Sequence, residues 1–307
     1  MAVTAAGERR VPSIHLFAVL PPLFWAGNFL IARMFHDAMP PLQMSFWRWL
    51  LAFLVIVPFT ARALIGSLPA IRRELGFLIF LGAIGITAFN SFIYAALQYT
   101  TVVNAALINS LMPVVTFLFA LVFIGDRLSP RQMLGVVLCV AGALFIVARG
   151  DLDLLLAFSL NAGDVLVLAG LTFWALYTVL IRWRKTALPP LVFLTVTIGF
   201  GVLFHLPLIA WEYSRQGGFA LNAANAAALA YLAIFPSLLA YIFWNRAVAA
   251  LGPGKTGLFM YLMPIFSTVL AVLLLGEAFR FYHLAGMVLI FFGIAMVTRA
   301  AAAAKPR

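Results

Sequence analysis

The side chains that could do chemistry in this 307-residue chain are mostly amides, hydroxyls and aromatic rings. They recur at steps of three and four residues within long apolar segments, a spacing that places them on one face of a helix. Because a polar group that faces lipid is unfavourable, we expect these faces to point into the protein. The two clearest faces consist of Thr87, Asn90 and Tyr94 in one segment and of Ser237, Tyr241, Trp244 and Asn245 in another.

Further residues of the same kinds extend this set: Trp25, Asn28, Asn109, Trp174, Tyr177 and Tyr261. Aromatic rings bury apolar or aromatic ligand surface, and amides and hydroxyls bind the ammonium and carboxylate groups of an amino acid. We therefore predict a central substrate-binding cavity lined by these side chains. The alternative is that Trp and Tyr anchor the chain at the membrane surface and Asn joins helices. We favour that alternative for Trp47 and Trp49, which lie near a segment end.

An enzymatic role would need a nucleophile beside a base, or a cluster of metal ligands. The four histidines are scattered along the chain, Cys139 is the single cysteine, and no Ser/His/Asp spacing occurs. We therefore predict a protein that is not an enzyme and that holds no metal and no cofactor. Cys139 is interpreted as a small packing residue.

Charged residues inside the apolar segments are scarce. Asp164 opens one segment, where it could cap a helix, and no acid is placed at the middle of a segment. Arg48 lies within a segment, and we expect it to snorkel or to pack structurally; binding of a substrate carboxylate is the alternative. His205 has no evident acidic partner and is interpreted as a packed neutral imidazole.

The elements that must position these residues are membrane helices. The chain is 65% hydrophobic and 9% charged, whereas a soluble domain carries about 25% charged residues. Its apolar runs are roughly 20 residues long, the length that a helix needs to cross ~30 Å of hydrocarbon. They predict an all-α integral membrane protein with ten transmembrane helices, at about 14–35, 42–60, 76–97, 102–124, 131–149, 163–183, 189–211, 224–246, 256–275 and 281–299.

The positive charges fall mainly on one side of this topology, although the net charge is +11. That bias predicts that both termini lie in the cytoplasm. It also explains the net charge without nucleic acid. The expected partners are the lipid bilayer and a small-molecule substrate, and the chain is expected to act as a monomer.

The chain repeats itself internally. The stretch "LMPVVTFLFALVFIGD" at Leu111–Asp126 is matched by "LMPIFSTVLAVLLLGE" at Leu262–Glu277, and "FWA" occurs at both 24–26 and 173–175. The repeat divides the chain into units 1–155 and 156–307, each with five helices. Because five is odd, the second unit must enter the membrane from the opposite side, and such inverted repeats are common in secondary transporters.

Each repeated stretch contains a proline and ends with a glycine and an acid. Pro113 and Pro264 are predicted to kink their helices and to act as opposing gates, the alternative being that each proline is merely tolerated. Gly125 and Gly276 are expected to end those helices.

These motifs carry a resemblance to a known family. "LFWAGNFLIARMFHDAMPPLQMSFWRWLLAF" resembles the start of an EamA-type half in the drug/metabolite transporter superfamily, and "AALQYTTVVNAALINSLMPVVTFLFALVFIGDRLSPRQMLGVVLCVAGALFIV" resembles its second part. "AVAALGPGKTGLFMYLMPIFSTVLAVLLLGEAFRFYHLAGMVLIFFGIAMV" is similar to that second part again. The resemblance implies a ten-helix carrier whose cavity opens to one side at a time. Within the superfamily the chain looks most like bacterial aromatic amino-acid exporters, a resemblance that implies a multi-pass protein of the bacterial inner membrane.

The expected function is therefore secondary transport, by alternating access, of small neutral or zwitterionic metabolites such as amino acids, including aromatic ones. Small multidrug relatives use a glutamate in the first span for proton exchange, and no acid lies between Pro12 and Phe35 here. We therefore expect transport without proton coupling. Export is implied by the resemblance alone. The alternative is a multidrug or nucleoside-type exporter of flat aromatic compounds, whereas a receptor or partner protein would need larger loops.

Overall fold

Ten long apolar helical segments make up the membrane-spanning part of the protein. The computed structural model describes residues 14–35, 37–96, 99–156 and 160–303, and within them it contains helices and no strand. The prediction of ten spans is confirmed. They are Ile14–Met34, Pro41–Gly66, Leu75–Ile93, Asn104–Ile124, Pro130–Val147, Ala162–Trp183, Pro190–Gln216, Ala223–Leu251, Pro253–Leu275 and Phe281–Thr298.

Six spans are single helices and four are interrupted. The single helices are α1 (Ile14–Met34), α2 (Pro41–Gly66), α8 (Pro130–Val147), α10 (Ala162–Trp183), α11 (Pro190–Gln216) and α16 (Phe281–Ala303). The third and eighth spans each contain a π-helical segment, in the orders α4 (Leu75–Gly82), η1 (Ala83–Ala88), α5 (Phe89–Ala96) and α12 (Ala223–Leu232), η2 (Ala233–Leu239), α13 (Ala240–Leu251). The fourth and ninth spans break, as α6 (Val102–Asn109), α7 (Met112–Ile124) and as α14 (Pro253–Leu258), η3 (Phe259–Tyr261), α15 (Leu262–Leu275).

The breaks lie beside the repeated Leu-Met-Pro motifs. Pro113 is the second residue of α7 and Pro264 the third residue of α15, so each proline occupies a first turn. Proline is accommodated there because its missing N–H would have no partner inside the helix. The helix is therefore interrupted just before the proline rather than kinked around it, and a gating role for these residues stays a prediction. Gly125 and Gly276 end α7 and α15 in the left-handed conformation, as predicted (φ 74° and 67°).

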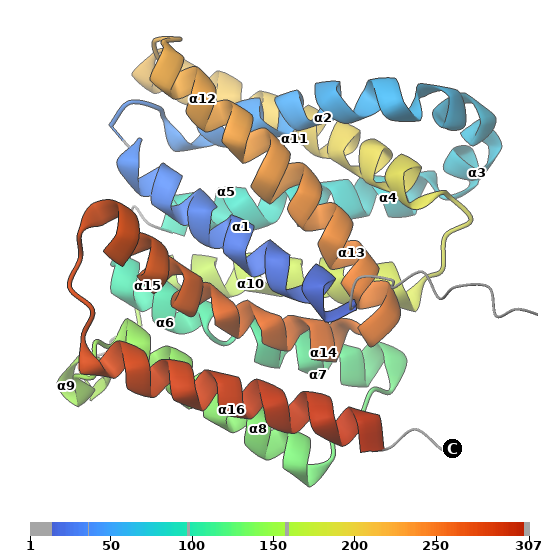
Figure 1. Cartoon of the computed structure of the whole chain (residues 1–307). Coiled ribbons are helices and arrows are strands. Elements are labelled where there is room, and N and C mark those ends of the chain that lie inside the picture. Colours follow the sequence, from blue (N-terminus) through green and yellow to red (C-terminus); the bar gives the residue numbers. More distant parts are fainter. Residues whose placement is uncertain (1–13, 36, 97–98, 157–159, 304–307) are drawn as a thin grey trace, which may run out of the picture.

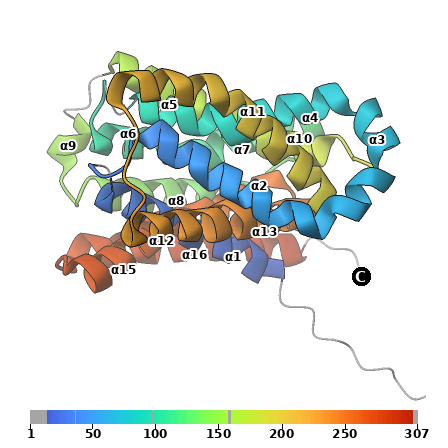
Figure 2. The same ribbon diagram turned by 90° about the horizontal axis from the view of Figure 1, so that it is seen from above.

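The helices form two layers (Figures 1 and 2). One layer contains α13, α1, α15 and α16, and the other contains α11, α5, α10 and α7. Helix α2 packs on α11 at one edge of the bundle, and α8 packs on α16 at the other. The start of α1 and the end of α16 lie at the same end of the bundle (Figure 1), as an even number of spans requires. Which membrane face this end occupies stays a prediction.

Glycines bring the backbones of α8 and α16 into contact. A Cβ atom on Gly142 would lie 2.6 Å from the Gly286 carbonyl oxygen, and one on Gly135 would lie 2.7 Å from the Gly293 carbonyl oxygen. Small residues allow such close approach between membrane helices. The later glycine of α8, Gly142, meets the earlier glycine of α16, Gly286, so the two helices are antiparallel. An inverted repeat predicts this arrangement. Cys139 is buried in this interface, so its interpretation as a packing residue is confirmed.

Two buried glutamates tie the repeats together at opposite ends of the bundle. Near the end of α11, the Glu212 carboxylate accepts hydrogen bonds from the N–H groups of Leu42 (3.1 Å) and Gln43 (2.8 Å) in the first turn of α2. It therefore satisfies backbone donors that have no partner within their own helix. This contact joins residues that are distant in the chain, so local sequence patterns do not predict it.

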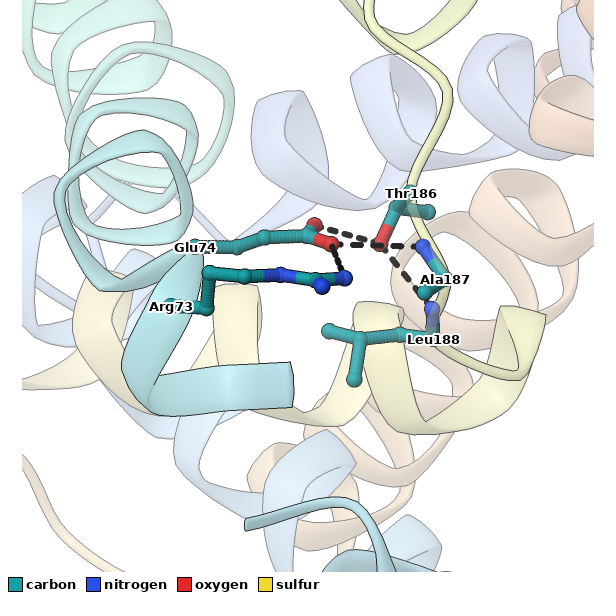
Figure 3. A network of polar contacts seen from close by, with 5 residues as sticks. All are labelled: Arg73, Glu74, Thr186, Ala187 and Leu188. Carbon is teal, nitrogen blue, oxygen red and sulfur yellow. Dashed lines mark hydrogen bonds and ion pairs between the residues drawn. The ribbon is translucent and has the colours of Figure 1, made fainter. Parts of the chain in front are cut away.

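The second glutamate, Glu74, follows the short helix α3 (Leu68–Arg73) and holds the segment that leads into α11 (Figure 3). Its carboxylate accepts hydrogen bonds from the Thr186 hydroxyl (2.6 Å) and the Ala187 N–H (3.3 Å), and Arg73 lies 3.8 Å away. The Thr186 hydroxyl in turn accepts from the Leu188 N–H at 3.1 Å. Glu74 and Glu212 thus each fix the start of a helix that belongs to the other repeat.

Asp164 takes part in capping its helix, as predicted, but as the second member of a capping box rather than as the N-cap residue. Asn161 is the N-cap of α10, and the Asp164 carboxylate accepts from the Asn161 N–H (3.0 Å) and the Thr100 hydroxyl (2.5 Å). A capping box of this kind places the acid three residues into the helix, while the preceding Asn supplies the cap.

Removing the charge of Glu212 should lower the stability of the bundle. We expect Glu212→Gln to reduce the free energy of unfolding by about 1–3 kcal/mol. The amide has one acceptor oxygen for two N–H donors, so its NH₂ group would face the second N–H and leave it without an acceptor. Glu277→Gln is the matched control, since the Glu277–Arg33 pair (3.3 Å) is exposed and should contribute no more than about 1 kcal/mol. Melting temperatures in detergent would test this, and equal values for the two variants would contradict it.

Candidate functional site

Six aromatic residues meet between the two layers, and we call them the aromatic cluster. Adjacent ring centroids lie 4.9–6.3 Å apart, mostly in edge-to-face or tilted pairs, which is the favoured geometry for aromatic contacts. All six side chains are buried. The cluster consists of Trp25 on α1, Trp49 on α2, Trp174 and Tyr177 on α10, and Tyr241 and Trp244 on α13.

The predicted cavity residues in this cluster contact one another. Tyr177 and Trp244 have an exposed fraction of 0%, so neither borders a space as large as a water molecule. A substrate could reach these rings only after the surrounding helices move apart. Their assignment as binding residues stays a prediction.

The cluster contains Trp49, a ring that was expected at the membrane surface. Trp49 is fully buried against Tyr241, with ring centroids 4.9 Å apart, so its interpretation as a surface anchor is wrong. Its neighbour Trp47 is 39% exposed and fits that interpretation. Successive helix positions differ by 100°, so two Trp residues two positions apart face different environments.

Polar groups of the cluster bind the π-helical segments of the opposite repeat. The Tyr241 hydroxyl donates to the Gly85 carbonyl oxygen in η1 (2.7 Å), and Trp25 Nε1 donates to the Pro236 carbonyl oxygen in η2 (3.1 Å). A π-helical turn alters the regular carbonyl pattern of a helix and often marks a functional site. Ser237, also predicted to line the cavity, is fully buried and donates to the Leu232 carbonyl oxygen within its own span (2.8 Å).

A positive charge lies beside the aromatic cluster. Arg48 is 4% exposed; its Nη1 donates to Asn28 Oδ1 (2.9 Å) and its Nη2 to Asn90 Oδ1 (2.7 Å). Its Cζ atom lies 5.2 Å from the centroid of the Trp49 ring, within cation–π distance. Arg48 therefore does not snorkel, because three side chains hold the guanidinium inside the protein. The predicted cavity residues Asn28 and Asn90 both bind this charge.

The other side chains predicted to line the cavity do not form one group. Asn245 is half-buried and accepts from the Tyr177 hydroxyl at 3.3 Å. Asn109 is half-buried at the end of α6, and its Oδ1 has no hydrogen-bond partner within the described residues. Tyr261 packs with Cys139 in a separate group of buried residues, apart from the aromatic cluster. The backbone of Tyr94 belongs to α5, and its side chain lies outside the described part of the structure.

His205 is buried in a polar network on α11. Its Nδ1 lies 2.9 Å from the Gly201 carbonyl oxygen and 3.2 Å from the Thr87 hydroxyl, and its Nε2 lies 3.2 Å from the Ser45 hydroxyl. Both ring nitrogens thus have uncharged partners. The prediction of a packed imidazole is confirmed. The residues that the structure describes contain no group of three or more His, Cys, Asp or Glu side chains that could hold a metal ion.

The bundle has ten spans, interruptions at matching positions in its two halves, and a buried arginine beside aromatic rings at its centre. These features are typical of a membrane transporter. The chain belongs to the EamA-like transporter family, which matches residues 12–148 and 161–299. These two ranges fall within the predicted units 1–155 and 156–307.

Relatives with this family's architecture cover nearly the whole chain. An uncharacterized transporter of Archaeoglobus fulgidus is 30% identical over 92% of this chain and 96% of its own, and the uncharacterized transporter YyaM of Bacillus subtilis is 28% identical over 92% of each. A protein of Streptantibioticus cattleyicolor named "Probable terminal-alkyne amino-acid exporter" is 27% identical over 92% of each chain. A crystal structure with 22% identity superposes with a TM-score of 0.77 over 96% of this chain and 99% of its own, which shows the fold alone.

Proposed function

We propose that the protein is a secondary transporter that exports small zwitterionic metabolites, foremost amino acids with apolar or aromatic side chains. The observation that carries this proposal is the pairing of the aromatic cluster with a buried guanidinium at the meeting point of four spans. Rings bury an apolar side chain, and fixed polar groups bind a charged end. The relative named "Probable terminal-alkyne amino-acid exporter" supports the same cargo class.

Alternating access would use the matching interruptions of the two repeats. The spans that contain η1 and η2 each hold a carbonyl oxygen that accepts a hydrogen bond from the opposite repeat, donated by Tyr241 and by Trp25 respectively. Exchanging these contacts would let one half rock against the other and open the centre to one membrane face at a time.

We expect transport to proceed without protons. The buried carboxylates of Glu74, Glu212 and Asp164 bind hydroxyl or backbone N–H groups at helix starts rather than the aromatic cluster. A proton-coupled carrier commonly places a titratable carboxylate along the substrate path. Transport here would follow the gradient of the substrate itself.

Reconstitution into liposomes tests this proposal. Labelled tryptophan and threonine should enter vesicles that contain the purified protein faster than empty vesicles, with initial rates that differ by less than about twofold when a pH gradient is imposed. Asn245→Ala should slow uptake because Asn245 bonds the Tyr177 hydroxyl of the cluster. Strong acceleration by a pH gradient would contradict the uncoupled mechanism.

A second cargo class is favoured by the six-ring cluster itself. Flat aromatic compounds such as nucleosides or lipophilic drugs would bind rings without needing an amino-acid backbone. Uptake of a labelled nucleoside, with no uptake of either amino acid, would assign the protein to this class.

A further inference from the structure

We propose that Arg48 binds the carboxylate of the transported molecule and thereby selects carboxylate-bearing cargo. This inference rests on the proposed transport function and names its specificity-determining residue. The evidence for it is the set of groups that contact the Arg48 guanidinium.

The guanidinium of Arg48 is buried without an anion. Within the described residues no carboxylate lies at ion-pair distance, and the two groups that accept its hydrogen bonds are neutral amide oxygens. A charge removed from water is strongly unfavourable unless it is paired. An arrangement that keeps such a charge unpaired among apolar spans marks a place where an anion arrives and leaves.

Its hydrogen-bonding capacity is also only partly used. A guanidinium offers five N–H donors; here Nη1 and Nη2 donate to Asn28 and Asn90, and the buried Nε has no partner within the described part of the chain. The remaining donors suit a carboxylate, which binds a guanidinium through two parallel hydrogen bonds. The two amides meanwhile hold the guanidinium plane in a fixed orientation.

The surroundings define the rest of the ligand. Trp49 lies against the guanidinium, and Trp25 lies one helical turn from Asn28 on α1. A carboxylate bound at Arg48 would therefore place its attached group among the rings of the aromatic cluster. The chemical class that fits is a carboxylate with an apolar or aromatic substituent, of which tryptophan is a test compound.

Tryptophan and tryptophanamide separate the carboxylate from the rest of the molecule. In reconstituted vesicles, the unmodified protein should carry tryptophan with a KM at least tenfold below that for tryptophanamide. Arg48→Gln should raise the KM for tryptophan at least tenfold and remove the discrimination. Arg184→Gln, which removes an exposed guanidinium lying over Phe77, is the matched control and should change neither KM.

A second variant tests the same point in a protein that keeps Arg48. Asn28→Asp places a carboxylate where the amide oxygen now lies, 2.9 Å from Nη1, so that the guanidinium gains a permanent anion. We expect Asn28→Asp to melt at or above the temperature of the unmodified protein and yet to raise the KM for tryptophan at least tenfold, because the internal carboxylate competes with the cargo. A purely structural arginine would give higher stability with unchanged KM, which would overturn the inference.

The outcomes separate the inference from the proposed function. Equal transport of tryptophan and tryptophanamide by the unmodified protein would overturn the role of Arg48 and leave the transport proposal intact. The same conclusion would follow if Arg48→Gln reduced the transport of tryptophan and of tryptophanamide equally while Asn28→Asp left the KM for tryptophan unchanged. Both the inference and the proposed function would be overturned if the unmodified protein transported neither tryptophan nor tryptophanamide and if neither compound raised its melting temperature.

Discussion

Replacing Gly142 by leucine should strongly reduce the amount of folded protein in the membrane. The first side-chain atom would lie 2.6 Å from the Gly286 carbonyl oxygen, a backbone atom that cannot rotate away. Helices α8 and α16 would have to separate, and overpacking of this kind costs at least about 1–3 kcal/mol before the rest of the leucine is placed. That is a large part of the roughly 5–15 kcal/mol that stabilises a typical protein.

Gly76→Leu is the matched control for this substitution. Gly76 also lies in a membrane helix, α4, but a Cβ atom there would meet nothing within 4 Å. The yield of monodisperse protein after detergent extraction and its melting temperature should fall only for Gly142→Leu. A well-folded Gly142→Leu protein would show that the α8–α16 contact contributes little to stability.

The topology could be predicted from the sequence because hydropathy depends on local composition. Each span is a run of apolar residues, and lipid leaves no other way to satisfy its backbone than a helix. The repeated Leu-Met-Pro motifs mark where the fourth and ninth spans are interrupted, although the prediction was a kink. The π-helical segment η1 contains no proline, whereas η2 contains Pro236, a local signal from which no prediction was made. Both segments pack against helices of the opposite repeat, which local sequence does not reveal.

The candidate site was predictable in its residue types but not in its contacts. The spacing of Trp25 and Trp174 placed both inside the protein, and their rings lie 5.1 Å apart. Structural packing of Arg48 was one of the predicted possibilities, but its partners Asn28 and Asn90 were not predicted because they come from two other spans. A charge between two tryptophans in an apolar segment was the available signal, and it did not identify those partners.

The aromatic cluster fills the space between the two layers through ring–ring contacts and two single hydrogen bonds. Its rings are held by neighbouring rings, while Tyr241 and Trp25 reach the π-helical segments of the opposite repeat through single hydrogen bonds. Aromatic pairs are favourable over a range of ring-centroid distances, about 4.5–7 Å. A broken hydrogen bond can be replaced by one to substrate or water. Under the proposed function, such an arrangement would exclude water in one state and receive an aromatic ligand in another.

Replacing Trp174 by alanine should have the largest effect of any single change in the cluster. Trp174 contacts the rings of Trp25, Phe89, Tyr177, Tyr241 and Trp244. Truncating a buried tryptophan removes about 3–5 kcal/mol from the free energy of unfolding. We expect Trp174→Ala to lower the melting temperature and to reduce tryptophan uptake into liposomes at least tenfold.

Trp183→Ala, on the same helix, gives the comparison that interprets this result. Trp183 is 52% exposed and touches Phe123 at the surface of the bundle, so its removal should leave uptake unchanged. Trp174→Phe keeps a ring in the cluster and should recover most of the lost stability. If Trp174→Phe restores stability while uptake stays low, the indole itself contributes to cargo binding. If Trp174→Ala folds and carries tryptophan at the original rate, the cluster does not lie on the substrate path. The half-buried Asn109, whose Oδ1 has no hydrogen-bond partner within the described residues, then becomes the stronger candidate.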